Sequence, residues 1–305
     1  VLVAMASVLT EGSVSIFNLA WNLQNVPLAL IGMSFSVAAF PTLVQLFSEN
    51  DRENFLRQLV IPARQIIFWS IPVIVFFIVL RAQIVRVILG AGVFSWTDTR
   101  LTAAALALFA ISVLFQSLIL LLVRGYYAAG RTWRPLAVIL IGACITVSSA
   151  FALLHVFETS VAFQAFIENV LRVPDVPGSS VLMLALAFTI GEACAFVLLW
   201  LVFRYEFMRS YATGIWRVVV QTGIASLGMG AVIYGFLRVF DNVFDINTFG
   251  GVLGQGFFSG LIGIIVFIAL LKVMGNREIN SMEQAFLSSR FWRIHILGSD
   301  QHDMK

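Results

Sequence analysis

Long apolar runs, separated by short polar loops, repeat along the whole chain. About 20 consecutive apolar residues cross a bilayer as a helix, and seven runs have that length. They cover residues 13–47, 64–80, 101–123, 135–157, 181–203, 215–237 and 250–274. Residues 1–9 are also apolar and look like the end of an eighth span. The pattern predicts an all-α integral membrane protein, a polytopic helical bundle with seven full transmembrane helices plus the end of an eighth, because barrel strands are shorter and less continuously apolar.

Composition supports a membrane protein. The 305 residues are 60% hydrophobic and only 11% charged, whereas soluble domains are about one-quarter charged. Val1 lies inside an apolar run that lacks the basic segment and cleavage site of a signal peptide, so we expect a fragment or a trimmed chain. Cys144 and Cys194 each lie in an apolar segment, which favours packing over a disulfide framework or a zinc site.

Basic residues divide unequally between the two sides that the spans define. If the loop at 49–64 is cytoplasmic, 14 of the 19 Lys and Arg residues share its side, including those of the C-terminal tail. The other five are Arg81, Arg86, Arg100, Arg172 and Arg238. Cytoplasmic loops carry an excess of Lys and Arg, so this split predicts a cytoplasmic C-terminus and supports the number of spans.

Two loops carry signals of further helices. Asn50 and Glu53 fit an N-cap and its partner three residues on, so we expect residues 51–61 to form an interfacial helix before the next span. In the connection at 158–180, the stretch VAFQAFIENVL is expected to lie flat on the outer surface.

The first span contains an unusual concentration of amides. Polar residues recur at spacings of four, three, four and three, which places them on one helical face if the helix extends back far enough. They are Glu11, Ser15, Asn18, Asn22 and Asn25, and Gly32 and Ser36 roughly continue the line. Gln24 lies off this line, and Pro27, which we mark as a helix break, frees a backbone carbonyl and permits bending.

Two interpretations of this face remain open. The amides can bond to neighbouring helices, where each contact contributes about 0.6 kcal/mol on average. Alternatively, Asn18, Asn22 and Asn25 line a hydrated cavity and contact a polar substrate, which the adjacent Pro27 favours.

Glu192 is the ionisable residue placed deepest within a span. A carboxylate at the middle of a bilayer costs about 2.5–3.5 kcal/mol on insertion scales. Glu192 therefore serves as an ion-coupling, proton-coupling or substrate site, or it remains protonated and bonds to a neighbouring helix. Gln116 with Ser112 is a weaker polar stripe, for which we expect packing.

Several classes of function lack their motifs. The chain has no phosphate-binding loop, dinucleotide fingerprint, HExxH motif or nucleophile elbow, so we expect no cofactor, no enzymatic reaction and no nucleic-acid partner. The glycine-rich stretch GVLGQGFFSG at 251–260 lies in a span, where Gly-xxx-Gly spacing favours close helix packing.

Three stretches have the order and spacing of motifs in a known family. They are FNLAWNLQNVPLALIGMSFSVAAFPTLVQ, ILGAGVFSWTDTRLTA and VRGYYAAGRTWRP. They resemble the segment after the lobe boundary, the G-x-F…D…TA connection and the (F/Y)Y-…-P loop of the MurJ/MviN lipid II flippases, within the multidrug/oligosaccharidyl-lipid/polysaccharide exporter superfamily. The similarity covers about residues 1–275 and is strongest at 12–48 and 88–135.

The resemblance implies a two-lobed fold of fourteen helices, of which this chain is the C-terminal half. Residues 1–204 would form the C-terminal transport lobe, with a partial helix and five spans. Residues 205–275 would add two transmembrane helices, which in this family help to form a groove for a lipid tail. Residues 276–305 would be a cytoplasmic tail.

The implied activity is to flip an undecaprenyl-linked peptidoglycan precursor, lipid II, across the bacterial cytoplasmic membrane by alternating access. Asn18, Asn22 and Asn25 would line the cavity, with Glu192 as a second site. The implied partners are the lipid-linked substrate, membrane lipids, the N-terminal lobe of the intact protein and an unidentified coupling ion.

One position departs from the family pattern. Well-studied members carry a cavity arginine five residues before the proline that corresponds to Pro27, and here that position is Asn22. An amide donates hydrogen bonds to a pyrophosphate but lacks the charge and the fork of arginine. A different cargo on the same fold therefore stays open, either another lipid-linked oligosaccharide or a drug exchanged for cations. A non-transporting membrane scaffold for cell-wall synthesis is a further alternative.

Overall fold

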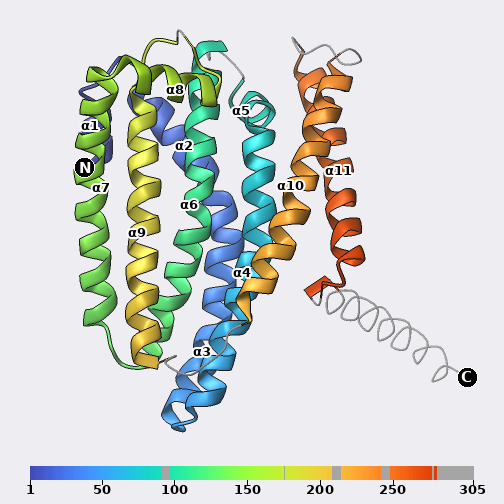
Figure 1. Cartoon of the computed structure of the whole chain (residues 1–305). Coiled ribbons are helices and arrows are strands. Elements are labelled where there is room, and N and C mark those ends of the chain that lie inside the picture. The colour runs from blue at the N-terminus through green and yellow to red at the C-terminus, as the bar shows by residue number, and fades with distance from the viewer. Residues whose placement is uncertain (91–95, 175, 208–213, 242–247, 277, 280–305) are drawn as a thin grey trace, which may run out of the picture.

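A computed structural model describes residues 1–90, 96–174, 176–207, 214–241, 248–276 and 278–279 (Figure 1). Within these residues all regular structure is helical. In chain order the helices are α1 (Leu2–Ala6), α2 (Ser13–Pro27), the π-helix η1 (Leu28–Met33), α3 (Ser34–Ser48), α4 (Arg52–Val79), α5 (Arg81–Leu89), α6 (Trp96–Ala128), α7 (Trp133–Thr159), α8 (Val161–Leu171), α9 (Val181–Phe207), α10 (Ile215–Phe240) and α11 (Phe249–Val273).

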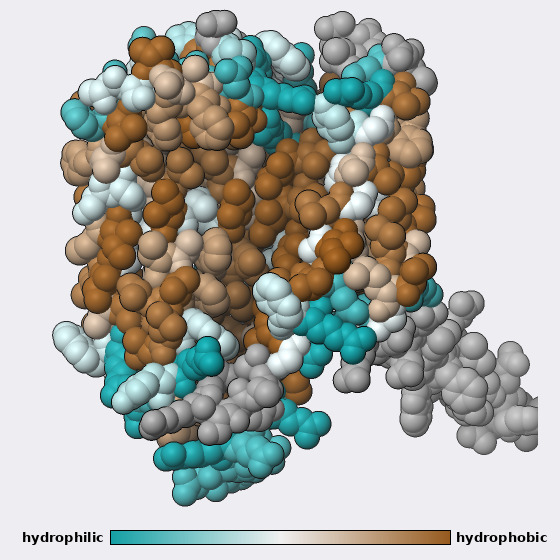
Figure 2. Space-filling model, in the orientation of Figure 1, coloured by the Kyte–Doolittle hydropathy of each residue, from teal (hydrophilic) through white to brown (hydrophobic). Residues whose placement is uncertain are grey.

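Seven helices of the described chain are long and apolar enough to cross a membrane. The first is a continuous 36-residue helix, Ser13–Ser48, which joins α2, η1 and α3, and the others are α4, α6, α7, α9, α10 and α11. Figure 2 shows a belt of hydrophobic residues around the middle of the bundle, with hydrophilic residues at its two ends. The predicted fold class and the seven predicted spans are confirmed.

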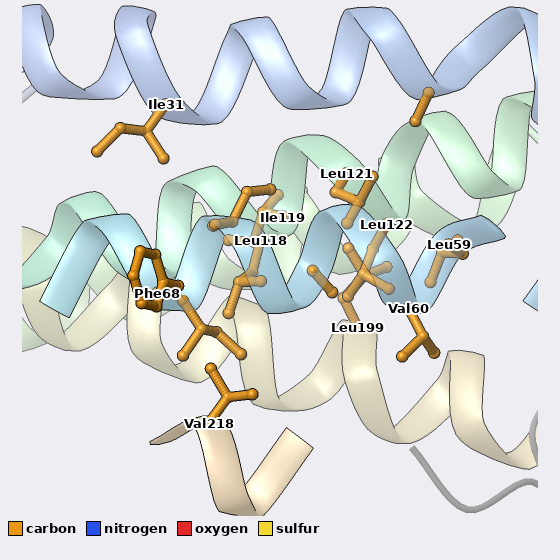
Figure 3. Packing of buried hydrophobic residues seen from close by; sticks show 14 of the residues in the cluster. Ile31, Leu59, Val60, Phe68, Leu118, Ile119, Leu121, Leu122, Leu199 and Val218 are labelled. Atoms are coloured by element: carbon orange, nitrogen blue, oxygen red, sulfur yellow. The ribbon is translucent and has the colours of Figure 1, made fainter. Parts of the chain in front are cut away.

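Helix α6 occupies the centre of the larger group of helices and packs against α2, α4 and α9. Of its most apolar stretch 67% of residues are buried, against 17% for α7 at the edge of the group. Figure 3 shows the core where Leu118 and Leu122 of α6 meet Leu59 of α4 and Leu199 of α9. Close packing of this kind holds helices together in a bilayer, where the lipid is as apolar as the side chains.

Small residues bring α7 and α9 into close contact. A methyl group at Gly142 would lie 2.7 Å from the Cβ of Ala195, and one at Gly191 would collide with the side chain of Thr146. The pairs Gly142–Thr146 and Gly191–Ala195 each have a spacing of four residues, so each pair forms one helical face. This is the small-residue packing typical of membrane helices.

Helices α10 and α11 form an antiparallel pair beside α4 and α5 (Figure 1). A methyl group at Gly260 of α11 would lie 3.0 Å from the ring of Phe76, and one at Gly256 would lie 3.2 Å from the Cβ of Gln83. Gly250 has no such neighbour within 4 Å. The close packing expected of the glycine-rich stretch thus occurs at Gly256 and Gly260 but not at Gly250.

Two helix-end predictions meet different outcomes. The stretch at Val161–Leu171 is helical, as expected, and α8 crosses the upper end of the bundle (Figure 1). The prediction of a separate interfacial helix at 51–61 is wrong, because α4 runs without interruption from Arg52 to Val79. Its N-cap is Asp51, whose side chain accepts a hydrogen bond from the backbone N–H of Asn54 at 3.2 Å, whereas Asn50 has a φ of 60°. Residue 50 therefore ends the preceding helix.

Candidate functional site

One face of α2 carries exposed polar side chains. The helix begins at Ser13, after Gly12 with a φ of 89°, so Glu11 lies outside it and its predicted place in the polar face is wrong. Glycine adopts this left-handed conformation readily, which ends any continuation of the helix towards Glu11. The exposed polar face consists of Ser15, Asn18 and Asn22, with Asn25 half-buried at its end.

The helix changes its hydrogen bonding after Pro27 and continues to Ser48. Proline lacks a backbone N–H, and six residues of π-helix follow it, so the angular register of later residues shifts. Gly32 and Ser36 are buried, and a methyl group at Gly32 would lie 3.0 Å from the Cα of Ser117 in α6. Gly32 packs against α6, and the buried Ser36 donates a hydrogen bond to the backbone oxygen of Gly32 at 2.6 Å, so the expected continuation of the exposed face through them is wrong.

Gln24 lies on the opposite face of α2 and is fully buried. Its side-chain oxygen accepts hydrogen bonds from Gln116 Nε2 at 3.2 Å and from Ser112 Oγ at 3.3 Å, both on α6. Gln116 also donates to Ser112 at 2.8 Å. The packing expected for Gln116 and Ser112 thus includes a third residue, and for Gln24 the helix-to-helix interpretation of an amide holds.

A cavity of about 510 Å³ lies between α1, α2, α7 and α9. Its lining includes Asn18 from α2 and Glu192 from α9, together with Thr146 from α7. The structure thus brings together two side chains that the sequence singled out separately. Asn22 and Asn25 do not line this cavity, although Asn22 lies one turn further along the exposed face.

Glu192 is half-buried in the cavity wall. In the part of the chain that the structure describes, no side chain forms a hydrogen bond or an ion pair with its carboxylate. Its position is fixed by the close contact of Gly191 with Thr146 and of Ala195 with Gly142. An unpartnered carboxyl group inside a bundle is suited to hold a proton, a cation or a hydrogen-bond donor of a substrate.

Aromatic rings pack together beside Asn18 and Glu192 in the wall of this cavity. The rings of Trp21 and Phe188, which both line the cavity, meet edge to face with centroids 4.7 Å apart. Phe109 of α6 packs against Trp21 at 5.5 Å and against Phe17 at 5.2 Å. Because such edge-to-face pairs restrict ring motion, the polar side of α2 rests on a defined surface.

A second cavity, also of about 510 Å³, is lined mainly by apolar side chains of α4, α6, α9 and α10. Trp200 of α9 and Trp216 of α10 lie at its border, with Ile67 and Leu118 among its aliphatic residues. Such a surface accepts a hydrocarbon chain rather than a polar headgroup.

The described residues contain no group of three His, Cys, Asp or Glu side chains that is arranged to hold a metal ion. Cys144 and Cys194 are both free. The polar cavity is the site at which two of the predicted residues, Asn18 and Glu192, meet.

A family model described as "Lipid II flippase MurJ" matches residues 1–252. The chain belongs to the MurJ family. This confirms the resemblance on which the sequence interpretation rests, and it places the chain in a family of transporters rather than of enzymes.

Individual members of the MurJ family show the extent of the similarity. A probable lipid II flippase MurJ of Thermotoga maritima is 26% identical over 280 residues, which are 92% of this chain and 50% of that protein. One of Bdellovibrio bacteriovorus is 32% identical over 158 residues, 49% of this chain and 29% of that protein. A structure of a lipid II flippase MurJ in an inward closed conformation has a TM-score of 0.61, at 22% identity, and matches 87% of this chain and 48% of that one. The chain thus spans about half the length of relatives that have its fold.

Proposed function

We propose that this chain forms the C-terminal half of a flippase that moves lipid II, an undecaprenyl-linked peptidoglycan precursor, across the cytoplasmic membrane by alternating access. Asn18, Asn22 and Asn25 contact the polar part of the cargo, and Glu192 is a second contact or the site of a coupling ion. Membership of the MurJ family, and a match that covers 92% of this chain and 50% of the Thermotoga maritima relative, support this proposal.

The observation that carries the proposal is the meeting of Asn18 and Glu192 at one cavity in an otherwise apolar bundle. Hydrocarbon satisfies neither an exposed amide nor a carboxyl group, so the face with Asn18 and Asn22 must adjoin water or protein. The N-terminal lobe of the intact protein is the partner that would complete a central cavity on this face.

We assign a separate role to each of the three parts of the chain. Residues 1–204 form the transport lobe, and residues 205–275 add α10 and α11, of which α10 borders the apolar cavity through Trp216. That cavity is suited to the undecaprenyl tail. The third part, 276–305, lies mostly outside the described residues. The excess of Lys and Arg on the side of the 49–64 loop supports a cytoplasmic C-terminus.

Reconstitution of the intact protein into vesicles tests this function. We expect lipid II to cross the membrane and the protein to rescue cells depleted of MurJ. Replacing both Asn18 and Asn22 by Leu should slow flipping about tenfold, the effect of losing about 1.4 kcal/mol of interaction. The matched control is Asn169→Leu, which removes an exposed amide from α8. No flipping and no rescue by the unaltered protein would refute the proposal.

Asn22 and Glu192 support a second candidate on the same fold. Without the family's arginine at position 22, a cation-coupled drug antiporter or an exporter of another lipid-linked oligosaccharide fits the polar face as well. Loss of drug efflux in Glu192→Gln, with lipid II flipping intact, would favour the antiporter. A non-transporting scaffold for cell-wall synthesis would depend on residues 276–305, and unchanged partner binding after their deletion would argue against it.

A further inference from the structure

Four arginines from distant parts of the chain converge on one cavity. Its volume is about 550 Å³, and it lies where α5, the end of α4, the start of α6, the end of α8 and the adjoining parts of α10 and α11 meet. The four are Arg81, Arg100, Arg172 and Arg238. Figure 1 shows these elements at the upper end of the bundle, and in Figure 2 hydrophilic residues gather there beside a hollow between α10–α11 and the other helices.

These arginines are four of the five basic residues that the sequence assigns to the side opposite the 49–64 loop. That side is the one on which Lys and Arg are disfavoured in short loops. The orientation of the protein in the membrane therefore does not explain why these arginines gather at one cavity.

Hydrogen bonds to neutral oxygens hold the guanidinium groups in place. Arg81 donates to the carbonyl oxygen of Leu171 at 2.7 Å, and Arg100 donates to that of Arg172 at 2.9 Å. Arg172 and Arg238 both donate to the hydroxyl of Tyr234, at 2.8 and 2.7 Å. Each guanidinium has five N–H donors, so most of this capacity is left for a ligand.

Carboxylates do not neutralise this charge in the part of the chain that the structure describes. At the other end of the bundle Arg131 and Arg134 pair with Glu206, and Arg64 pairs with Glu278 at 3.4 Å. Among the described residues that line the cavity, Asp241 is the one acidic residue, and it accepts a hydrogen bond from Gln255 at 2.6 Å. The cavity therefore carries a net positive charge.

Two local features show the cost of this arrangement. Burial, and then the nearby Arg172 guanidinium, lower the pKa of Arg81 from its ordinary value. Arg172 itself has a φ of 59°, a left-handed conformation in which glycine is the favoured residue. Left-handed residues other than glycine occur often at ligand-binding sites, and they also end helices, as Arg172 does for α8.

The walls of the cavity indicate the kind of anion. Ile78, Val79, Val170 and Leu237 lie among the lining residues, so apolar surface adjoins the guanidinium groups. The volume of about 550 Å³ exceeds that of a single phosphate group. Arginine in place of lysine at all four positions favours the two-pronged recognition of phosphate oxygens.

We propose that this cavity binds the phosphate group of a membrane lipid, with the lipid's first hydrocarbon segments against its apolar walls. Either a bulk phospholipid or a polyprenyl diphosphate presents this chemistry. The inference goes beyond the proposed function, because it concerns a different cavity and does not depend on which cargo is moved.

Binding of defined lipids to the intact protein in detergent tests the site. The probes are phosphatidylglycerol, undecaprenyl diphosphate and a diglucosyl diacylglycerol, which has similar chains to the first but no phosphate. We expect both phosphate lipids to bind at least about tenfold more tightly than the glycolipid, and inorganic pyrophosphate to compete with them. Tighter binding of undecaprenyl diphosphate than of phosphatidylglycerol would identify the carrier lipid as the occupant, and equal binding would identify bulk phospholipid.

Variants assign the binding to this cavity. The double change Arg100→Gln with Arg238→Gln should weaken phosphate-lipid binding about tenfold or more. Arg172→Gly should also weaken it while it relieves the left-handed backbone, so the protein should stay folded. The matched control is Arg86→Gln at the same end, since Arg86 stacks on Trp96 at 4.7 Å and does not line the cavity. Unchanged binding in the double variant, or equal binding of the phosphate-free lipid, would overturn the inference.

Discussion

Helix α2 carries amides on two opposite faces, and the two faces have different surroundings. Gln24 is buried and bonds to Gln116 and Ser112 of α6, whereas Asn18 and Asn22 are exposed and face away from that core. The residue type is almost the same, so composition alone does not separate a structural amide from a functional one. What separates them is whether the bundle itself supplies the hydrogen-bonding partners.

The comparison extends to energetics. Gln24 contributes to the contact between α2 and α6, a contribution of about 0.6 kcal/mol for an average polar contact between membrane helices. Asn18 and Asn22 make no comparable contact inside the described bundle, and hydrocarbon would leave them unsatisfied. Their face is therefore best explained by water, cargo or another lobe.

The largest expected effect concerns the walls of the cavity with Glu192. Gly191→Leu places a side chain where Thr146 of α7 already lies, so α7 and α9 must separate. Overpacking of this kind costs about 3 kcal/mol or more when backbone atoms stand in the way. Thermal unfolding in detergent measures the loss. Gly223→Leu on α10 is the control, because no atom lies within 4 Å of the added carbon there. Equal losses in both variants would contradict the close contact.

Gln24→Ala should have the next largest effect. It removes a buried side chain and leaves Gln116 with one partner fewer, so we expect the free energy of unfolding to fall by about 2 kcal/mol. Asn22→Ala, on the exposed face of the same helix, should change it by less than about 0.5 kcal/mol. If chemical or thermal unfolding finds the opposite order, the assignment of the two faces is wrong.

Asn22→Arg introduces the charge that the resemblance to the family leads us to expect at this position. An exposed position tolerates the larger side chain, so stability should change little. A charged hydrogen bond to the pyrophosphate should tighten lipid II binding about tenfold. Titration of labelled lipid II into the intact protein measures this change. If both Asn22→Arg and Asn22→Lys bind lipid II more weakly than the unaltered protein does, the cargo has no diphosphate near Asn22.

The smallest effect is a coupling energy. A double-mutant cycle that replaces Gln24 and Gln116 by Ala should give a coupling of about 0.6 kcal/mol, and no more than about 1.7 kcal/mol. The cycle for Asn22 and Gln116 should give a coupling near zero, because no contact joins them. A coupling in the second cycle as large as in the first would remove the distinction between the faces.

The sequence predicted the spans well because runs of about 20 apolar residues are a strong signal. It predicted their ends less well. Helix α4 begins at Arg52, twelve residues before the apolar run at 64–80, since Arg, Glu, Leu and Gln favour helix and the backbone continues through Pro62. Periodicity places Glu11 on the first helix, because it does not reveal that Gly12 takes a left-handed conformation.

The candidate sites depended on contacts that a single sequence does not contain. Asn18 and Glu192 each stood out as polar groups in apolar surroundings, but only the folded chain puts them at one cavity. The charge count assigns the four arginines to one side, but it cannot show that they converge on one cavity, because residues 81 and 238 are far apart in sequence.

Reactivity of single cysteines tests the difference between the two faces of α2 most directly. In the intact protein with its native cysteines, Cys144 and Cys194 included, replaced by Ala, we would introduce Asn18→Cys, Asn22→Cys or Gln24→Cys and add a maleimide that does not cross membranes. The account predicts that the cysteines at positions 18 and 22 react, that lipid II slows both reactions, and that the cysteine at position 24 stays unreactive. Reaction at position 24, or no protection by lipid II at positions 18 and 22, would contradict it.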